Sequence, residues 1–179
     1  TIQKKKTGYL ALLNRIQKED IDLQNIPAIQ PIENEGLKNL ASGFGWRTHP
    51  IYKYRAKHLG VDFSCPEGTP VYATADGKVS TIKKTYGKYG KYIEINHGNN
   101  YITRYCHFDD WTVKRGEEVK RGDVIGHVGG STTLVPHLYY EVLYNNINRN
   151  PVHYFFLDLN ENEYEKIYEL ATIENQSLN

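Results

Sequence analysis

Short hydrophobic runs separated by turn residues make up most of the chain between positions 42 and 156. The runs are rich in Val, Ile, Tyr and Thr, and glycines punctuate them at short intervals. This pattern is typical of β-strands joined by tight turns, and the pair Asn99-Asn100 suits a hairpin. The expected strands cover residues 60–63, 70–73, 77–85, 92–96, 101–108, 123–128 and 137–144. We therefore predict a mainly β protein with a compact antiparallel sheet or sandwich core.

The start of the chain has a different pattern. Apolar residues between positions 9 and 16 recur at helical spacing and predict a short amphipathic helix. The two prolines of residues 26–32 exclude a helix there and favour an extended strap across the domain surface. We expect residues 1–41 to form this N-terminal helix and strap.

The tail of the chain predicts a second helix. Asn160 is an N-cap candidate, and Glu163 follows three residues later at the spacing of a capping box. Apolar residues between positions 164 and 171 then share one helical face. We expect residues 42–156 to form the β domain and residues 157–179 to form a C-terminal helix packed on it.

Composition and charge exclude several classes of partner. The 179 residues are enough for one domain with a hydrophobic core. A formal net charge of +1 gives no strong field for nucleic acid or anionic lipid. No apolar run approaches the roughly 18 residues that cross a bilayer, so we predict no membrane span in this segment. Two cysteines, Cys65 and Cys106, are too few for a disulfide framework; we expect two buried thiols, with pairing as the alternative.

The first candidate for chemistry is the pair His58 and Asp62. In an extended strand, residues four apart return to the same face, so this imidazole and this carboxylate would converge. Nitrogen and oxygen ligands of this kind suit zinc. The spacing also arises often by chance, and a surface histidine near a solvated aspartate is the simpler explanation when it stands alone. Gly60 between them provides flexibility or allows a close approach of the backbone.

Two further segments carry imidazole or carboxylate groups. His107 falls within an otherwise apolar and aromatic strand, where a buried histidine with one core hydrogen bond is the usual explanation. In the last predicted strand, His137, Tyr139 and Glu141 alternate onto one face. Three polar groups aligned on one face indicate a functional site more strongly than any single residue does.

In these segments the chain resembles the lysostaphin/LytM-type zinc endopeptidases, which cut peptide cross-links in bacterial peptidoglycan. The resemblance covers about residues 42–156 and rests on several motifs in a fixed order. These are Phe44-Gly45-Trp46-Arg47 with His49-Pro50, His58-x-Gly60-x-Asp62-Phe63, Gly68-Thr69-Pro70-Val71-Tyr72-Ala73, Asp76-Gly77-x-Val79, Asn96-His97-Gly98, Tyr105-x-His107, Val119-x-x-Gly122-x-x-Ile125-Gly126 and Pro136-His137-Leu138-x-Tyr140-Glu141. The fold that it implies is the duplicated hybrid motif.

The resemblance also implies roles for the candidate residues. His58 and Asp62 match metal ligands, and His107 and His137 match the catalytic histidines that flank the zinc-bound water. Zinc held by three protein groups lowers the pKa of bound water and polarises the scissile carbonyl. The family has its third ligand, a histidine, two residues after His137, where this chain has Tyr139.

A tyrosine at the third-ligand position predicts weak or absent zinc binding. A phenol has a reference pKa of about 10, so binding at neutral pH would require the metal to displace its proton. The tyrosine side chain is also longer than that of histidine and fills more of the pocket. Glu141, on the same face, is the available replacement ligand, although the matching glutamate in the family is not a ligand.

Two functions therefore remain open. In the first, the domain is a peptidoglycan-directed member of the family in which zinc-dependent catalysis is impaired or absent, and it pairs with or activates an active hydrolase. In the second, it is an active zinc endopeptidase that hydrolyses peptide cross-links. We expect the first. Both imply peptidoglycan peptides as partners and a location in the cell envelope, periplasmic or extracellular.

Overall fold

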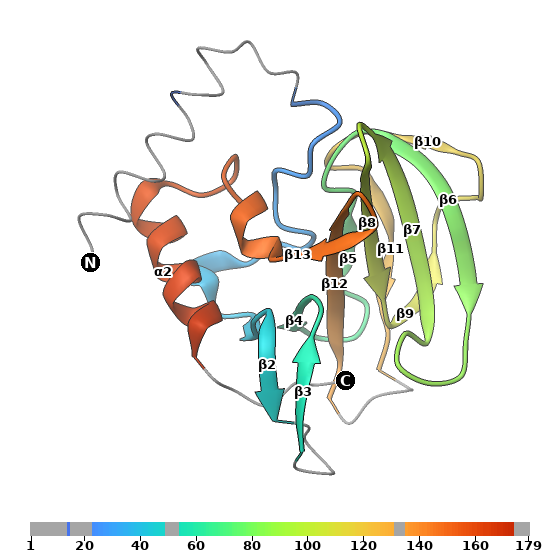
Figure 1. The fold of residues 1–179 in the computed structure, drawn as a ribbon. Helices are drawn as coiled ribbons and strands as arrows, with labels where there is room; N and C mark the ends of the chain where they lie inside the picture. Colours follow the sequence, from blue (N-terminus) through green and yellow to red (C-terminus); the bar gives the residue numbers. More distant parts are fainter. Residues whose placement is uncertain (1–13, 15–22, 49–53, 131–134, 174–179) are drawn as a thin grey trace.

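Antiparallel sheets dominate the computed structural model, which describes residues 14, 23–48, 54–130 and 135–173 (Figure 1). Seven strands of the large sheet run in the order β1 (Leu40–Ser42), β4 (Val61–Ser64), β12 (His137–Tyr144), β8 (Tyr101–Cys106), β7 (Lys91–Gly98), β6 (Gly77–Lys84) and β10 (Glu118–Val119), and β13 (Ile147–Arg149) pairs with β12. The mainly β fold predicted from the sequence is confirmed.

Two smaller sheets accompany the large one. The first contains β5 (Pro70–Tyr72), β11 (Val124–Val128) and β9 (Phe108–Trp111), and the second is the hairpin of β2 (Gly45–Thr48) and β3 (Arg55–His58). The hairpin lies beside β4 at the lower end of the molecule in Figure 1. The sequence pattern did not predict β1, β2, β3, β9, β10 or β13, because these short strands lack a clear alternation of apolar and polar residues.

Helices cover one end of the large sheet. The helix α2 (Glu161–Thr172) begins at Asn160, and the predicted capping box is present: the Asn160 side chain accepts from the Glu163 amide, and the Glu163 side chain accepts from the Asn160 amide. Ile167 and Ala171 are its buried residues. Two short 3-10 helices, η1 (Glu35–Leu37) and η2 (Pro151–Tyr154), lie nearby. Apart from Asn14, the helix expected at residues 9–16 falls outside the described residues. Among the described residues, no helix is long and apolar enough to cross a membrane.

The strap at residues 26–32 contains bends and no helix, and it does not lie on the surface. The Ala28 amide donates to the Thr74 carbonyl at 3.1 Å, and the Tyr72 amide donates to the Pro31 carbonyl at 2.8 Å. Ala28 and Ile32 are buried. The expectation of a surface strap was wrong because its apolar side chains pack into the domain while its backbone bonds to neighbouring loops and β5.

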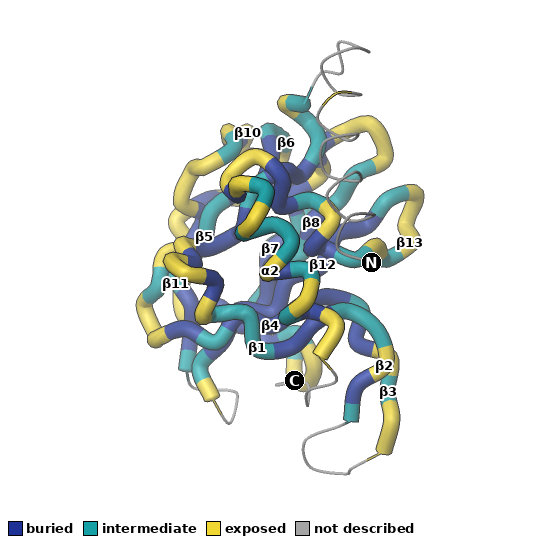
Figure 2. Tube along the Cα trace, turned by 90° about the vertical axis from the view of Figure 1, so that its left-hand side faces the viewer, coloured by how far each residue is buried: buried dark blue, intermediate teal, exposed yellow. Residues whose placement is uncertain are grey.

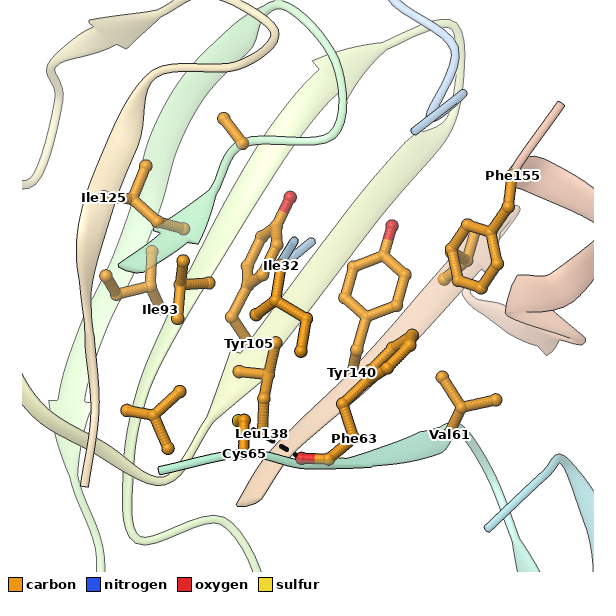
Figure 3. Close-up of a cluster of buried hydrophobic side chains, with 14 of the residues drawn as sticks. Ile32, Val61, Phe63, Cys65, Ile93, Tyr105, Ile125, Leu138, Tyr140 and Phe155 are labelled. Carbon is orange, nitrogen blue, oxygen red and sulfur yellow. Dashed lines mark hydrogen bonds between the residues drawn. The ribbon is translucent and has the colours of Figure 1, made fainter. Parts of the chain in front are cut away.

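The hydrophobic core lies between the large sheet and the β5–β11–β9 sheet. It draws Phe63 from β4, Tyr105 from β8 and Tyr140 from β12 against Ile125 of β11 (Figure 3). β12 is the most buried strand, since seven of its eight residues are buried. Figure 2 shows the same contrast for the whole chain: the central strands are largely buried and the turns are exposed.

A hydroxyl cluster bridges this core. Figure 3 shows Tyr105 and Tyr140 side by side, with their hydroxyl groups pointing the same way. The Oγ1 atom of Thr74 lies 3.0 Å from the Tyr105 hydroxyl and 2.8 Å from the Tyr140 hydroxyl. All three side chains are buried, so the Thr74 hydroxyl provides a partner that water cannot supply to either tyrosine. The Tyr105 hydroxyl also accepts from the Thr103 hydroxyl and from the Thr74 amide, both at 2.9 Å.

Replacing Thr74 by valine is expected to lower the free energy of unfolding by about 1–3 kcal/mol, because two buried tyrosine hydroxyls lose a partner. Urea unfolding followed by circular dichroism measures the change. Thr112→Val is the matched control, since the exposed Thr112 hydroxyl bonds only to the Val124 carbonyl at 2.8 Å. Equal unfolding midpoints for the two variants would contradict the expected role of the cluster.

Candidate functional site

His58 and Asp62 meet, but not on one strand as the sequence analysis expected. His58 ends β3 in the small hairpin, and Asp62 lies in β4 of the large sheet. The chain turns between them, and the turn brings His58 Nε2 to 3.3 Å from Asp62 Oδ1. The Nδ1 atom of His58 lies 2.9 Å from the Gly43 carbonyl oxygen, which leaves Nε2 as the nitrogen directed at the carboxylate.

Gly60 makes this turn possible. A Cβ atom at this position would lie 2.2 Å from the Tyr140 carbonyl oxygen and 2.7 Å from Tyr139 Cε2. Both distances are far shorter than van der Waals contact, so only glycine allows β12 to pass this close. The close backbone approach considered in the sequence analysis is thus the reason for Gly60.

His107 and His137 complete a cluster around Asp62. His137 begins β12, and its Nε2 atom lies 3.9 Å from Asp62 Oδ1. The two imidazole rings have centroids 4.6 Å apart. His107 is not inside a strand as predicted: it separates β8 from β9 and has a φ of 72°, a left-handed conformation that is rare outside glycine. This break in the strand turns the His107 side chain toward His137.

The imidazoles of the cluster are buried. Burial, followed by the proximity of His137, lowers the pKa of His107 to about 4, so this ring is uncharged at neutral pH. His58 Nε2, both ring nitrogens of His107 and His137 Nε2 are buried and form no hydrogen bond among the described residues. Buried polar nitrogens normally have a partner, so these atoms suit a ligand such as a metal ion.

Tyr139 turns its hydroxyl away from this cluster. The hydroxyl donates to Glu141 Oε1 at 2.5 Å, while the ring stacks on His58 with centroids 5.1 Å apart. Burial raises the pKa of the Tyr139 phenol well above its usual range, and the Glu141 carboxylate raises it further. Tyr139 is therefore a protonated hydrogen-bond donor, which is the wrong state for a metal ligand.

Glu141 is occupied in the same network. Its Oε2 accepts from Arg104 Nη1 at 2.5 Å, while its Oε1 accepts from Tyr139. Arg104 also donates through Nε and Nη2 to Glu94 Oε1, at 2.8 and 2.6 Å. The side chain of Glu141 is fully buried, and these bonds hold its charge in place. The contacts thus argue against Glu141 as a replacement metal ligand.

The residues present fit a three-ligand zinc site only in part. His58 and Asp62 converge as the family pattern requires, but the residue at the third position is bonded to Glu141. Within the part of the chain that the structure describes, no three His, Cys, Asp or Glu side chains form a metal-binding group. The ligand and catalytic roles assigned from the sequence therefore stay predictions.

Some of the residues that surround Tyr139 were not among the candidates predicted from the sequence. The main one is Arg104 of β8. In the pairing of β12 with β8, Glu141 lies opposite Arg104 and Tyr139 lies opposite Cys106. The alternation of side chains along β8 is therefore the signal that could have identified Arg104. Both cysteines are buried free thiols, as expected. His97 is buried in β7, where its ring bonds to Thr103 and to the Asp76 carbonyl.

An antiparallel β fold around a buried cluster of histidines and an aspartate agrees with the peptidase resemblance of the sequence. The model of peptidase family M23 matches residues 56–151, more than half of the chain. The chain belongs to this family. The peptidoglycan DD-endopeptidase ShyC of Vibrio cholerae is 44% identical over 107 residues, which cover 59% of this chain and 24% of the relative. The chain thus spans about a quarter of the length of such relatives.

Solved structures support the same assignment. A zinc-containing peptidase from Vibrio cholerae superposes with a TM-score of 0.59 and 38% identity, covering 72% of this chain and 38% of that one. The catalytic domain of lysostaphin from Staphylococcus simulans gives a TM-score of 0.58 and 27% identity, covering 69% of this chain and 98% of that one. Lysostaphin's catalytic domain is therefore matched over nearly its whole length.

Tyr139→Phe is expected to destabilise the protein by about 1–3 kcal/mol, because Glu141 loses a charge-assisted hydrogen bond within the protein. The free energy of unfolding in urea measures the loss. Tyr86→Phe removes the same atom from a fully exposed side chain and serves as the control. A Tyr139→Phe protein as stable as the control would mean that the bond to Glu141 contributes nothing.

Proposed function

We propose that this domain acts on the peptide cross-links of peptidoglycan in the cell envelope. The observation that carries the proposal is the buried cluster of His58, Asp62, His107 and His137, in a chain that belongs to peptidase family M23. Relatives that are 42–44% identical over the matched segment are described as peptidoglycan DD-endopeptidases. A location in the cell envelope follows from that substrate.

The residues of the cluster suit this reaction. A zinc ion, when bound, would activate water and polarise the scissile carbonyl. His58 Nε2 and Asp62 Oδ1 are the atoms that would hold it. His107, neutral because burial lowers its pKa, can accept a proton from the attacking water. His137 lies beside it with its Nδ1 atom 2.8 Å from the Val135 carbonyl oxygen, so Nε2 faces the reaction site.

Two forms of this function have separate support. The described activities of the relatives favour an active zinc endopeptidase over the impaired form expected from the sequence. The hydrogen bond from Tyr139 to Glu141 favours the impaired form, because it removes the third ligand and keeps the phenol protonated. In the impaired form the domain would bind peptidoglycan peptides and act through an active hydrolase partner.

Zinc affinity separates the two forms. Structural zinc sites bind with about 10–16 kcal/mol, so one ligand in four contributes about 3–4 kcal/mol, or a few hundredfold in affinity. Tyr139→His is therefore expected to bind zinc a few hundredfold more tightly than the wild type in isothermal titration calorimetry. Tyr139→Phe, which also lacks the phenol but supplies no ligand, is the control.

Wild-type protein that retains one zinc per chain through dialysis would exclude the impaired form. If Tyr139→His gains nothing over Tyr139→Phe, the site has lost more than one side chain.

Release of fragments from cross-linked peptidoglycan tests the activity itself. If the domain is an active endopeptidase, chromatography of the digest should show cross-linked peptides converted to monomers, and His137→Ala should lower the rate by at least about a hundredfold. The Tyr139→His protein provides a positive reference. Cleavage by Tyr139→His but not by the wild type would support the impaired form, and equal cleavage by wild type and His137→Ala would contradict both assignments.

A further inference from the structure

Lys88 lies at the boundary between the buried cluster and solvent. It belongs to the loop that joins β6 to β7, and its side chain is 40% exposed. Its Nζ atom lies 5.0 Å from the centre of the Tyr139 ring and 5.3 Å from the centre of the Tyr89 ring. The ammonium group thus sits over the aromatic residues that adjoin the catalytic histidines.

The ammonium group has hydrogen-bond donors to offer. Its nearest carboxylate oxygen is Glu141 Oε1 at 3.9 Å, which is beyond hydrogen-bond distance. That oxygen already accepts from Tyr139, and Arg104 already balances the charge of Glu141. Lys88 forms no hydrogen bond with any residue that the structure describes. Glu141 therefore attracts the Lys88 ammonium group, but the three N–H donors of that group are not used in a hydrogen bond to Glu141.

The neighbouring cations differ from Lys88 because they donate hydrogen bonds to described residues. Arg104 donates to both Glu94 and Glu141, so its guanidinium is engaged on two sides. Lys91 donates a hydrogen bond to the Asp109 carbonyl oxygen and lies 3.7 Å from the Asp109 carboxylate. Lys88 combines exposure, available donors and a position over Tyr139.

The field of Lys88 reaches the catalytic histidines. Burial is the largest cause of the lowered pKa of His107, His137 lowers it further, and the positive charge of Lys88 adds a smaller lowering, while Asp62 acts in the opposite direction. A ligand group that binds the ammonium would therefore lie close to the reacting centre. A negatively charged group is attracted to the Lys88 ammonium group. Because the rings of Tyr139 and Tyr89 contact the ammonium group on one side, its solvent-exposed side can bind a second partner.

We propose that Lys88 binds a carboxylate of the peptide substrate and so selects peptides with a free carboxylate next to the bond to be cut. This inference rests on the proposed function, because it assigns a recognition residue for the same peptides. A main-chain amide is neutral, whereas a free chain end or an acidic side chain carries the negative charge that pairs with an ammonium. Lys88 would act on binding and leave the proton transfers to the histidines.

The alternative role for Lys88 is structural, as a counter-charge for Glu141. In that case Lys88→Met would lower stability and would weaken binding of charged and uncharged peptides equally. Direct recognition predicts instead a loss confined to the charged peptide, with rescue by Lys88→Arg. The two roles are thus distinguished by comparing how each protein binds a charged peptide and an uncharged peptide.

The test uses cross-linked peptides released from peptidoglycan, either with free carboxylates or with the carboxylates converted to amides. All proteins carry His137→Ala so that the peptides stay intact. Isothermal titration calorimetry is expected to show about fivefold to tenfold tighter binding of the carboxylate form, lost in Lys88→Met and kept in Lys88→Arg. Lys91→Met is the matched control and should keep the preference.

The outcomes are distinct. Equal binding of both peptides, or a preference that persists in Lys88→Met, would overturn the role of Lys88 and leave the proposed function standing. Binding of neither peptide would remove the proposed function itself, and this inference with it. A preference that disappears in Lys88→Met and Lys91→Met alike would show a general charge effect and would also overturn the assignment.

Discussion

β12 is hydrogen-bonded on both sides, to β4 and to β8, and the register of these two pairings fixes the site. Tyr139 lies opposite Asp62 on one side and opposite Cys106 on the other, and Glu141 lies opposite Arg104. Because side chains alternate along a strand, a shift of one residue would turn His137, Tyr139 and Glu141 into the core. The burial of β12 therefore determines which groups can meet at the cluster.

The same register couples the cluster to the buried charge of Glu141. A fully buried carboxylate requires a charged partner, and Arg104 of β8 supplies it. Once Glu141 is held there, the Tyr139 hydroxyl finds a strong acceptor two residues along its own strand. The choice of partner for Tyr139 is thus a consequence of how β8 and β12 are paired.

Family membership and site chemistry answer different questions about this domain. The match to peptidase family M23 defines the family and the fold. The proposed catalysis would depend on the cluster of His58, Asp62, His107 and His137, and Tyr139 stands at the position predicted for the third ligand. The role proposed for Lys88 rests on the proposed function, and it concerns binding of the peptide and not the proton transfers.

The sequence by itself determined the β class, the capping box at Asn160 and the strand 137–144, because alternation and capping are local patterns. It also identified the members of the cluster. Only the tertiary structure decided that His58 and Asp62 meet across a turn, since Gly60 is required by the passage of β12 and not by its own neighbours. The partner of Tyr139 was likewise decided by Arg104, a residue far away in sequence that only strand pairing brings near.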